Sequence, residues 1–487
     1  KISGNVSGNN ILISDAEFEN VTFDGNIINY IPKGYALADK DGNLVNIYKS
    51  SVEQLCVFVK HTANDHKLDE NGVCGCGWNK VPEKNENGAY MISDAEELLW
   101  FSYWVNMGNN TSNAVLLNDI DLSELSFVIG SVQTPYMGTF DGCGKTVSNL
   151  NLNVTRNDTG LFGSLYGAEV RNFNINGKIT ADSVYTHIGS VAGSAKANSV
   201  ISMIVSDVDI ESTAAIKHVG GIVGSSEVDG IKGTLLVENC IYTGTINSPD
   251  SDDSIGGILG YANADITVKS CGFAGNITAK SCKGGILGYV NNANFGGIIN
   301  SYSCGTVNGA QISGIVGKGG NKITDCYYTE GTTPFYGNDA ASCTAAALSK
   351  DAWTNGEAVF YLNGKKLDEN SMWKQTLGED AYPNFSGKSV YIAGKDMYGN
   401  QRKAVMYADG ENICMYNFPA GSLAAVAVYS GNSLVNVKYV YVSEKNVYTF
   451  GELGITAENG GSFLVMLFDG NINFKPLCEA VKISFEE

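Results

Sequence analysis

One tetrapeptide pattern recurs in the middle of the chain, as Gly221-Ile222-Val223-Gly224, Gly257-Ile258-Leu259-Gly260, Gly285-Ile286-Leu287-Gly288 and Gly314-Ile315-Val316-Gly317. A further copy stands at Gly160-Leu161-Phe162-Gly163, and a weaker one begins at Gly189. The first glycines are residues 160, 189, 221, 257, 285 and 314, so the period is about 30 residues. Each copy is followed by two more short stretches that alternate apolar and polar residues. Three short strands per repeat, with no helical pattern between them, predict a parallel β-solenoid.

The register of the repeat can be checked outside the tetrads. If Gly244, Gly275 and Gly305 are aligned, Cys240, Cys271 and Ser301 fall into one column, which Cys326 continues. We expect this column to face inward, as free thiols that act as small hydrophobic side chains. A disulfide between neighbouring turns is the alternative, because adjacent strands lie about 4.8 Å apart.

The segment before the repeats contains the clearest helical pattern of the chain, at residues 93–106. Ser93 is a suitable N-cap and Glu96 completes a capping box. Leu98, Phe101, Trp104 and Val105 form an apolar stripe at helical spacing. We therefore expect an amphipathic helix that covers the first turn of the solenoid and protects its open edge.

Residues 388–487 form a separate region, with strand-like runs at 389–393, 423–429, 434–442 and 463–468 divided by turn signals such as Asp469-Gly470-Asn471. This pattern predicts a seven-stranded β-sandwich. The fold class is thus all-β, a right-handed parallel β-helix with a short helical N-cap, followed by a β-sandwich. The expected divisions are a short β region at 1–50, a Cys/His-containing linker at 51–87, the β-helix at 88–340, a solenoid-closing segment at 341–387, and the sandwich at 388–487.

The chain resembles the GLUG repeat proteins, which are named after the tetrad. The resemblance covers about residues 88–340 and is carried by the runs YMISDAEELLWF, NAVLLNDIDLS, MGTFDGCGKTVSNLNL and TGLFGSLYGAEVRNFNI. These repeats occur in secreted and surface proteins of Gram-positive and gut bacteria, including adhesins. The resemblance implies an extracellular location, secreted or attached to the cell surface. Because the chain begins with Lys1, we expect that a leader or an upstream region has been removed.

Composition limits the partners. The 487 residues carry 32 basic and 51 acidic side chains, a net charge of −19, and only Arg156, Arg171 and Arg402 are arginines. Nucleic acid is therefore excluded as a partner, because phosphate contacts need clustered Lys and Arg. No apolar run approaches the length of about 20 residues that crosses a bilayer, so direct membrane insertion is not expected. We expect a monomer that binds a host or environmental glycan or protein.

A metal site is conceivable between residues 56 and 76. This segment contains Cys56, His61, His66, Cys74 and Cys76, and thiolates and imidazoles are the ligands that zinc prefers. Three interpretations stay open: a structural zinc site, a local disulfide, and a loop without a ligand, which the C-x-C spacing favours. Calcium is a second metal to consider, at Asp250, Asp252 and Asp253 or at Asp39-Lys40-Asp41-Gly42, but neither loop has the full calcium-binding spacing. No cofactor is expected.

The sequence contains few candidate catalytic residues. H-E-x-x-H and G-x-S-x-G are absent, and His187 and His218 each precede a tetrad as residues at the edge of a turn. The alternative function is a β-helix carbohydrate-active enzyme, a glycoside hydrolase or polysaccharide lyase, which needs two nearby carboxylates. Its candidates are Asp119 with Asp121, Asp207 with Asp209, and Asp141.

Tyrosines at repeating positions are the candidate binding residues, because exposed rings stack on sugars or anchor proteins. They are Tyr242, Tyr261, Tyr289, Tyr302, Tyr327 and Tyr328. The sequence therefore predicts a non-catalytic adhesin, or a ligand-binding or spacer module. A passive stalk of a larger surface protein is a further alternative.

Overall fold

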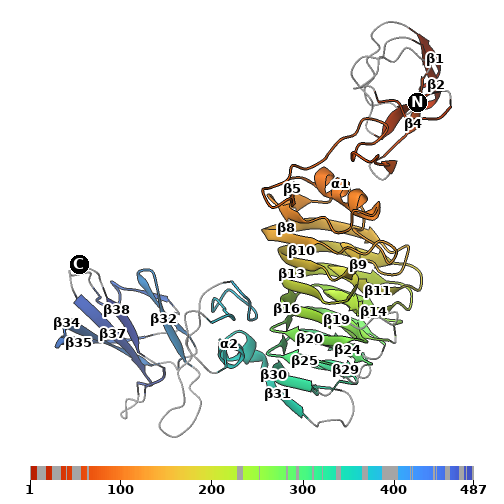
Figure 1. Cartoon of the computed structure of the whole chain (residues 1–487). Coiled ribbons are helices and arrows are strands. Elements are labelled where there is room, and N and C mark those ends of the chain that lie inside the picture. Colours follow the sequence, from red (N-terminus) through yellow and green to blue (C-terminus); the bar gives the residue numbers. More distant parts are fainter. Residues whose placement is uncertain are drawn as a thin grey trace. The chain divides into compact units, whose positions relative to one another are not determined.

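The structure is a computed structural model of the whole chain (Figure 1). It describes residues 2–7, 18–24, 34–39, 41–46, 56–62, 65–226, 234–251, 253–280, 283–291, 295–309, 312–320, 322–335, 342–364, 371–386, 404–416, 418, 421–442, 445, 447–455, 461–470, 476–478 and 480–484. The chain forms two compact units. The first comprises Lys1–Gly297, Gly305–Lys322 and Phe335–Asp339, and the second comprises Ile298–Cys304, Ile323–Pro334 and Ala340–Glu487.

The first unit contains a parallel β-solenoid, so this prediction is confirmed. Short strands stack from turn to turn into three parallel sheets, and the full solenoid has about six turns (Figure 1). One sheet contains β11 (Thr186–Gly189), β14 (Lys217–Gly220), β18 (Ile255–Gly256), β23 (Lys283–Gly284) and β28 (Ile312–Ser313). A second contains β9 (Phe162–Tyr166), β12 (Ala192–Lys196), β15 (Val223–Ser225), β19 (Leu259–Ala262), β24 (Leu287–Val290) and β29 (Val316–Lys318).

The third sheet is the largest, because some of its strands run on across a corner of the turn. Its strands in this unit are β5 (Tyr90–Ile92), β6 (Ala114–Leu116), β7 (Ile120–Asp121), β8 (Thr139–Asn153), β10 (Glu169–Ala181), β13 (Ser199–Ser212), β16 (Thr234–Tyr242), β17 (Thr245–Ser248), β20 (Asp265–Lys269), β21 (Gly272–Phe273), β22 (Asn276–Ala279) and β27 (Thr306–Asn308).

The tetrads lie in register from turn to turn. The third residues of four successive tetrads are direct partners, Val223 with Leu259, Leu259 with Leu287, and Leu287 with Val316. The weak copy is shifted by one residue from its expected position, because Ala192 pairs with Val223. Ser190, and not Gly189, therefore takes the place of the first glycine in that turn.

The first glycine of the tetrad leaves room for an aromatic ring. A Cβ atom on Gly221 would lie 2.3 Å from the Tyr242 ring, and one on Gly257 would lie 2.4 Å from the Phe273 ring. Carbonyl oxygens of the next turn stand equally close, 2.1 Å and 2.2 Å from the same two positions. The repeat thus needs glycine here because backbone and ring approach where a side chain would otherwise stand.

The interior of the solenoid is apolar and contains the expected thiols. Cys240 and Cys271 are fully buried on neighbouring turns, and both are free cysteines. Burial raises the pKa of the Cys271 thiol well above its ordinary value. The prediction of inward-facing free thiols is confirmed for these two residues, and the disulfide alternative is not seen between them.

An α-helix, α1 (Ala95–Asn106), covers the first turn (Figure 1). Leu98, Phe101 and Val105 are fully buried, as expected, and the Phe101 ring lies 6.5 Å from the Phe140 ring of β8. The N-cap is Asp94 rather than Ser93, because the Asp94 carboxylate accepts a hydrogen bond from the Glu97 backbone N–H.

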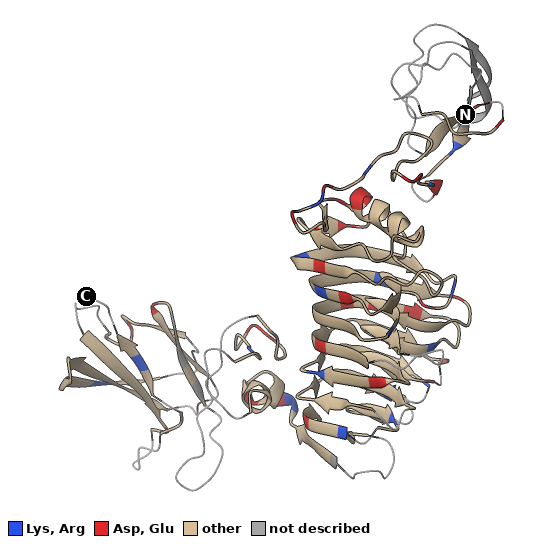
Figure 2. Cartoon of the chain, viewed as in Figure 1, with Lys and Arg blue, Asp and Glu red and all other residues tan. Residues whose placement is uncertain are grey.

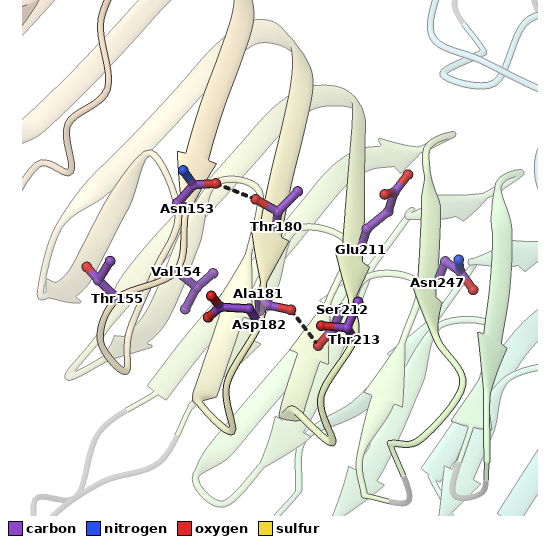
Figure 3. Close-up of a pocket in the computed structure, with 10 residues that line it drawn as sticks. All are labelled: Asn153, Val154, Thr155, Thr180, Ala181, Asp182, Glu211, Ser212, Thr213 and Asn247. Atoms are coloured by element: carbon purple, nitrogen blue, oxygen red, sulfur yellow. Dashed lines mark hydrogen bonds between the residues drawn. The ribbon is translucent and has the colours of Figure 1, made fainter.

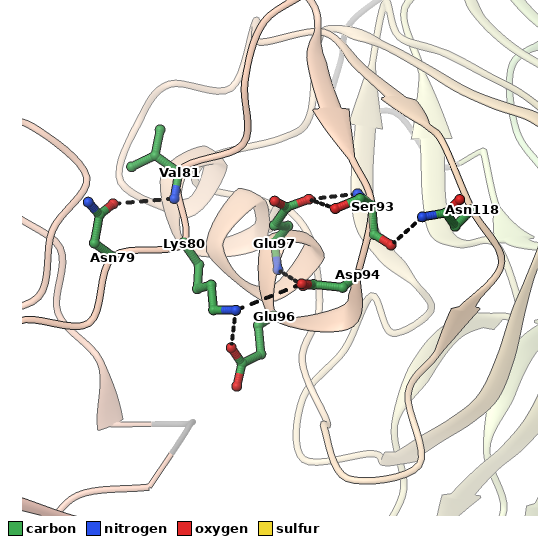
Figure 4. A network of polar contacts seen from close by, with 8 residues as sticks. All are labelled: Asn79, Lys80, Val81, Ser93, Asp94, Glu96, Glu97 and Asn118. Atoms are coloured by element: carbon green, nitrogen blue, oxygen red, sulfur yellow. Dashed lines mark hydrogen bonds and ion pairs between the residues drawn. The ribbon is translucent and has the colours of Figure 1, made fainter. Parts of the chain in front are cut away.

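The capping partner also differs from the prediction by one residue. Glu97 accepts hydrogen bonds from the backbone N–H and the hydroxyl of Ser93, whereas Glu96 forms an ion pair with Lys80 at 2.8 Å (Figure 4). The box therefore spans Ser93 to Glu97, one residue longer than the motif that the sequence suggested.

A small sheet stands before the helix, with the strand order β1-β2-β4-β3. Its strands are β1 (Ile2–Ser7), β2 (Phe18–Asp24), β3 (Tyr35–Ala38) and β4 (Cys56–Lys60). Strand β4 lies inside the stretch expected to be a linker, where it pairs antiparallel with β2 and β3.

The second unit begins with strands that pair in parallel, β25 (Gly297–Ile299) and β26 (Tyr302–Ser303) with β30 (Lys322–Thr329). Ser301 and Cys326 are fully buried here. Next come β31 (Ser342–Leu348), the 3₁₀ helix η2 (Lys350–Trp353) and α2 (Glu357–Leu362). The rings of Trp353 and Trp373 pack against the Tyr302 ring, with centroids 5.6 Å and 5.2 Å from it, respectively.

The remainder of this unit is the expected β-sandwich. Its described strands form two antiparallel sheets that share one hydrophobic core. Three strands form the first sheet, β32 (Val405–Asp409), β33 (Asn412–Tyr416) and β36 (Val447–Thr449). Four form the second, β34 (Leu423–Ser430), β35 (Ser433–Tyr441), β37 (Gly461–Phe468) and β38 (Val481–Ser484). The expected strand at 389–393 lies outside the described residues. Among the described residues, no helix is both long and apolar enough to cross a membrane.

Candidate functional site

Four of the five candidate metal ligands converge at one point. His61 follows β4 directly, and Cys74 and Cys76 lie in a hairpin that the bridge between Leu68 and Cys74 closes. The turn between the histidines is fixed by the Asp65 carboxylate, which accepts hydrogen bonds from the backbone N–H and the hydroxyl of Thr62. The four ligand atoms all lie within 4.8 Å of one another.

The individual distances describe a compact cluster. His61 Nε2 is 3.0 Å from His66 Nδ1, Cys74 Sγ is 3.6 Å from His61 Nε2, and Cys76 Sγ is 3.7 Å from His66 Nδ1. His61, Cys74 and Cys76 are buried, and His66 is partly buried. Two imidazoles and two thiols therefore share one small space that is shielded from solvent.

The two thiols differ in their readiness to lose a proton. A hydrogen bond with Cys76, the largest effect, and contact with His66 lower the pKa of Cys74 to about 3. The same hydrogen bond raises the pKa of Cys76 above its ordinary value. One thiolate is thus favoured in the cluster even before any metal is considered.

Cys56, the fifth candidate, lies at the opposite end of β4 from His61. Five residues of strand at about 3.3 Å each separate the two positions by roughly 16 Å along the backbone. Sequence reasoning missed Trp78, whose ring stacks on the His66 imidazole with centroids 4.2 Å apart and an interplanar angle of 7°. The sequence signal for this contact is the position of a tryptophan two residues after the C-x-C motif.

The two candidate calcium loops are turns with local hydrogen bonds. The Asp39 carboxylate accepts from the backbone N–H groups of Asp41 and Asn43, which closes a hairpin. Asp253 accepts a hydrogen bond from the Ser254 hydroxyl, and Asp252 lies outside the described residues. Within the part of the chain that is described, only the cysteine–histidine cluster gathers metal-ligating side chains.

The candidate catalytic carboxylates hold neighbouring turns together. Asp119 accepts a hydrogen bond from the backbone N–H of Thr146, and Asp121 accepts one from the Asn149 amide. This amide and the Ser123 N–H lower the pKa of Asp121 below its ordinary value.

Asp207, Asp209 and Asp141 are engaged in the same way. Asp207 accepts from the Thr243 hydroxyl, and Asp209 from the Thr245 N–H. Asp141 forms an ion pair with Arg171 at 2.9 Å. Each of these bonds links a turn to the next one, so the chemistry that the structure gives these five carboxylates is a stabilising one.

The six candidate tyrosines do not share a face. Tyr242 and Tyr302 are fully buried, with the Tyr242 hydroxyl donating to the Val208 carbonyl at 2.8 Å. A binding role for these two is not retained, because no ligand can reach them. Tyr328 is 8% exposed, and Tyr327 is half-buried against the Tyr361 ring.

Tyr261 and Tyr289 do lie together, on neighbouring strands of the second sheet. They continue an aromatic column in which the rings of His187, His218 and Tyr261 stack, with centroids 5.1 Å and 4.2 Å apart. Tyr261 is 8% exposed and Tyr289 is half-buried beneath the Lys318 ammonium group. The rings of this column pack against one another, so their faces are not free to stack on a sugar.

A regular polar surface lies on the third sheet, along strands β8, β10, β13, β17, β22 and β27. We name it the ladder face. It consists of two columns of outward-facing residues, each with one residue per turn. One column is Asn151, Lys178, Asp209, Thr245, Asn276 and Thr306, and the other is Asn153, Thr180, Glu211, Asn247, Thr278 and Asn308. The apolar residues that alternate with them, such as Ile179, Ile210 and Ile246, are fully buried.

A pocket of about 410 Å³ opens at the edge of this face (Figure 3). Asn153, Thr180, Glu211 and Asn247 stand on four successive strands along it. The Thr180 hydroxyl donates to the Asn153 amide oxygen at 2.5 Å, and Glu211 forms an ion pair with Lys178 at 2.7 Å. The lining offers amide, hydroxyl and carboxylate groups. Its regular spacing follows directly from the stacking of the turns.

Charged residues are sparse over the solenoid, where most of the ribbon is uncharged and acidic and basic positions are interspersed (Figure 2). In comparisons with known proteins, no family model and no curated protein matches the chain.

Proposed function

We propose that the protein is a non-catalytic binding and spacer module outside the bacterial cell, whose solenoid presents the ladder face to a glycan or a protein. The observation that carries this proposal is the pairing register. It places two polar columns side by side over successive turns, about 4.8 Å apart from one turn to the next. Such a surface is flat, periodic and backed by a rigid core.

The chemistry of the ladder face suits a neutral polar ligand. Nine of its twelve residues are Asn or Thr, which both donate and accept hydrogen bonds. Its charges are largely satisfied internally, through the Lys178–Glu211 ion pair and the Thr245–Asp209 hydrogen bond. With a net charge of −19, the whole chain would repel polyanions. A neutral glycan, with many hydroxyl groups at regular intervals, is the ligand that fits best.

The proposed location outside the cell rests on the resemblance to GLUG repeat proteins. The non-catalytic proposal is supported by the five candidate aspartates, whose carboxylates are engaged in bonds between turns. A hydrolase would instead need one protonated carboxyl group free to donate its proton to a leaving group, and a second, ionised one free to act as base or nucleophile.

The test is a glycan array probed with the purified chain, with mass spectrometry of the same wells for released sugars. The variant Asn247→Ala/Thr278→Ala truncates two outward-facing side chains that are neighbours in one column of the ladder face. Its matched control is Thr267→Ala/Lys269→Ala on β20, in another part of the same sheet.

We expect binding without cleavage, and at least about tenfold weaker binding by the ladder variant than by the control. Equal weakening in both variants would contradict the assignment to the ladder face. New reducing ends or unsaturated sugars would contradict the non-catalytic proposal.

A further inference from the structure

We propose that His61, His66, Cys74 and Cys76 bind one zinc ion, which holds together the region that precedes helix α1. This region, residues 34–80, is called the knob below. The proposal does not depend on the ligand of the solenoid. It follows from the spacing of the four ligand atoms, the size of the core around them, and the contacts of the hairpin that carries them.

The spacing matches a tetrahedral zinc site. Zinc binds thiolate sulfur at about 2.3 Å and imidazole nitrogen at about 2.0–2.1 Å. In a regular tetrahedron these bond lengths place two nitrogens about 3.3 Å apart, and a nitrogen and a sulfur about 3.6 Å apart. The corresponding distances are 3.0 Å between the imidazoles, and 3.6 Å and 3.7 Å between sulfur and nitrogen. Small shifts would bring all four atoms to the same ion.

The described part of the knob has a small apolar core, and two of the ligands belong to it. The buried cluster of this region consists of Ala36, Cys74 and Cys76, with Leu44, Val59 and Trp78 packed against it. A core of this size offsets only part of the entropy cost of ordering the segment. A structural metal supplies the missing free energy, because the ion binds the folded segment and not the unfolded one.

The hairpin geometry resolves the unusual C-x-C spacing. The Gly77 N–H donates to the Cys74 carbonyl at 2.8 Å, and the Cys74 N–H donates to the Trp78 carbonyl at 3.0 Å. This tight turn brings the two sulfurs to the same side although only Gly75 separates them. The Trp78 N–H also donates to Cys76 Sγ at 3.4 Å, the kind of bond that supports a metal-bound thiolate.

The ion would also secure the knob against helix α1. The indole N–H of Trp100 donates to the Gly72 carbonyl at 2.7 Å, and a Cβ atom on Gly72 would lie only 2.7 Å from the Trp100 ring. Trp78, stacked on His66, meets Tyr103 edge to face at 6.5 Å. The hairpin that supplies two ligands therefore rests on the residues that cap the solenoid.

The ligand set identifies both the metal and its role. Two thiolates and two imidazoles select zinc over calcium or magnesium, which require oxygen ligands. Four protein ligands complete the tetrahedron, so no position remains for water or substrate, and the role is structural.

The first experiment measures bound zinc by inductively coupled plasma mass spectrometry in the full chain, purified without chelator. The variants are His66→Asn and Cys74→Ser. The control is Cys143→Ser, since Cys143 is an exposed free cysteine outside the cluster. We expect about one equivalent of zinc in the unmodified chain and the control, and less than about 0.2 equivalents in the two variants. The circular dichroism of the solenoid should be unchanged in all four proteins.

A second measurement does not depend on the variants. Cobalt added to the zinc-free chain should give the intense visible bands of tetrahedral cobalt together with thiolate charge transfer. Three results would each overturn the proposal: a zinc content near zero in the unmodified chain, equal zinc in the chain and both variants, or a Cys74–Cys76 disulfide in the protein as purified.

Discussion

The solenoid and the knob reach a stable fold by opposite routes. In the solenoid, each turn covers the apolar side of the next, so residues such as Ile222, Ile258 and Ile286 are all fully buried. In the knob, two of the three members of the buried cluster are the ligand cysteines. The comparison shows that repetition lets a chain form a core from short strands, whereas a single short segment needs a cross-link.

The largest expected effect is on the solenoid, at the glycine where two turns meet. Gly257→Val places a side chain 2.2 Å from the Gly285 carbonyl oxygen and 2.4 Å from the Phe273 ring. Because a backbone atom cannot move aside, we expect a loss of more than about 4 kcal/mol in the free energy of unfolding. Chemical denaturation followed by circular dichroism measures it. Gly144→Asn is the control, since a Cβ atom there meets nothing within 4 Å and Asn tolerates the positive φ. Similar losses in both variants would contradict the role of close approach.

The second prediction separates the knob from the solenoid. Removal of zinc with a chelator should increase amide hydrogen exchange in residues 56–80 by at least about a hundredfold and leave the strands of 139–308 unchanged. The reason is that the proposed ion holds the knob, whereas the core of the solenoid contains no ligand of it. A uniform increase along the chain would show that the two regions unfold together.

The third prediction concerns the contact between the two regions. Trp100→Phe keeps most of the buried ring but removes the donor to the Gly72 carbonyl. We expect a cost of about 1–3 kcal/mol, because a buried carbonyl loses its partner. Faster hydrogen exchange at residues 68–78, with unchanged exchange in β10 and β13, would show that the hydrogen bond from Trp100 to Gly72 links the knob to helix α1. Trp104→Phe is the matched control, because its ring packs beside Trp100.

The fourth prediction tests the corrected helix cap. Asp94→Ala removes the side chain that accepts from the Glu97 N–H, and should cost about 1 kcal/mol in thermal unfolding experiments. Glu96→Ala removes only an exposed ion pair with Lys80 and should cost less than half as much. A larger loss for Glu96→Ala than for Asp94→Ala would instead support the capping box of Ser93 and Glu96 that the sequence pattern predicts.

The smallest expected effect depends on pH. Burial alone would raise the pKa of Asp141, but hydrogen bonds from the Cys143 N–H, Arg171 and Asn172 outweigh it and lower this pKa. Such a carboxylate contributes stability above its unfolded pKa of about 3.9, and the contribution is lost as the pH falls through the lower folded value. Asp141→Asn should therefore be slightly less stable than the unmodified chain at pH 7, and the difference should vanish below about pH 3. Denaturation curves across this range measure it. A difference that stays constant with pH would rule out the ion pair as its cause.

The solenoid could be predicted from the sequence because its pattern is repeated, so single errors do not matter. The tetrads fixed the period even though Ser190 replaces the first glycine of one turn. The expected column of Cys240 and Cys271 is likewise confirmed, since alternation along a strand determines which residues face inward.

The candidate sites were harder to predict, because they depend on distances across the fold. Tyr242 and Phe273 point inward since glycines at 221 and 257 leave space for their rings, and the sequence shows glycine and ring only as separate signals. The C-x-C spacing argued against a metal, yet the turn at Gly77 brings both sulfurs together. The ladder face was missed because its residues are ordinary Asn and Thr, and only the register between turns makes them a surface.

Because the register between turns is constant along the ladder face, the length of this face is proportional to the number of turns. Every turn adds one residue to each column of the ladder face and extends the stack by about 4.8 Å. Duplicating one repeat would therefore lengthen the surface by one step without altering the steps already present. The length of the ligand that the surface can match is counted in whole turns, and gene duplication can change that count without any new chemistry.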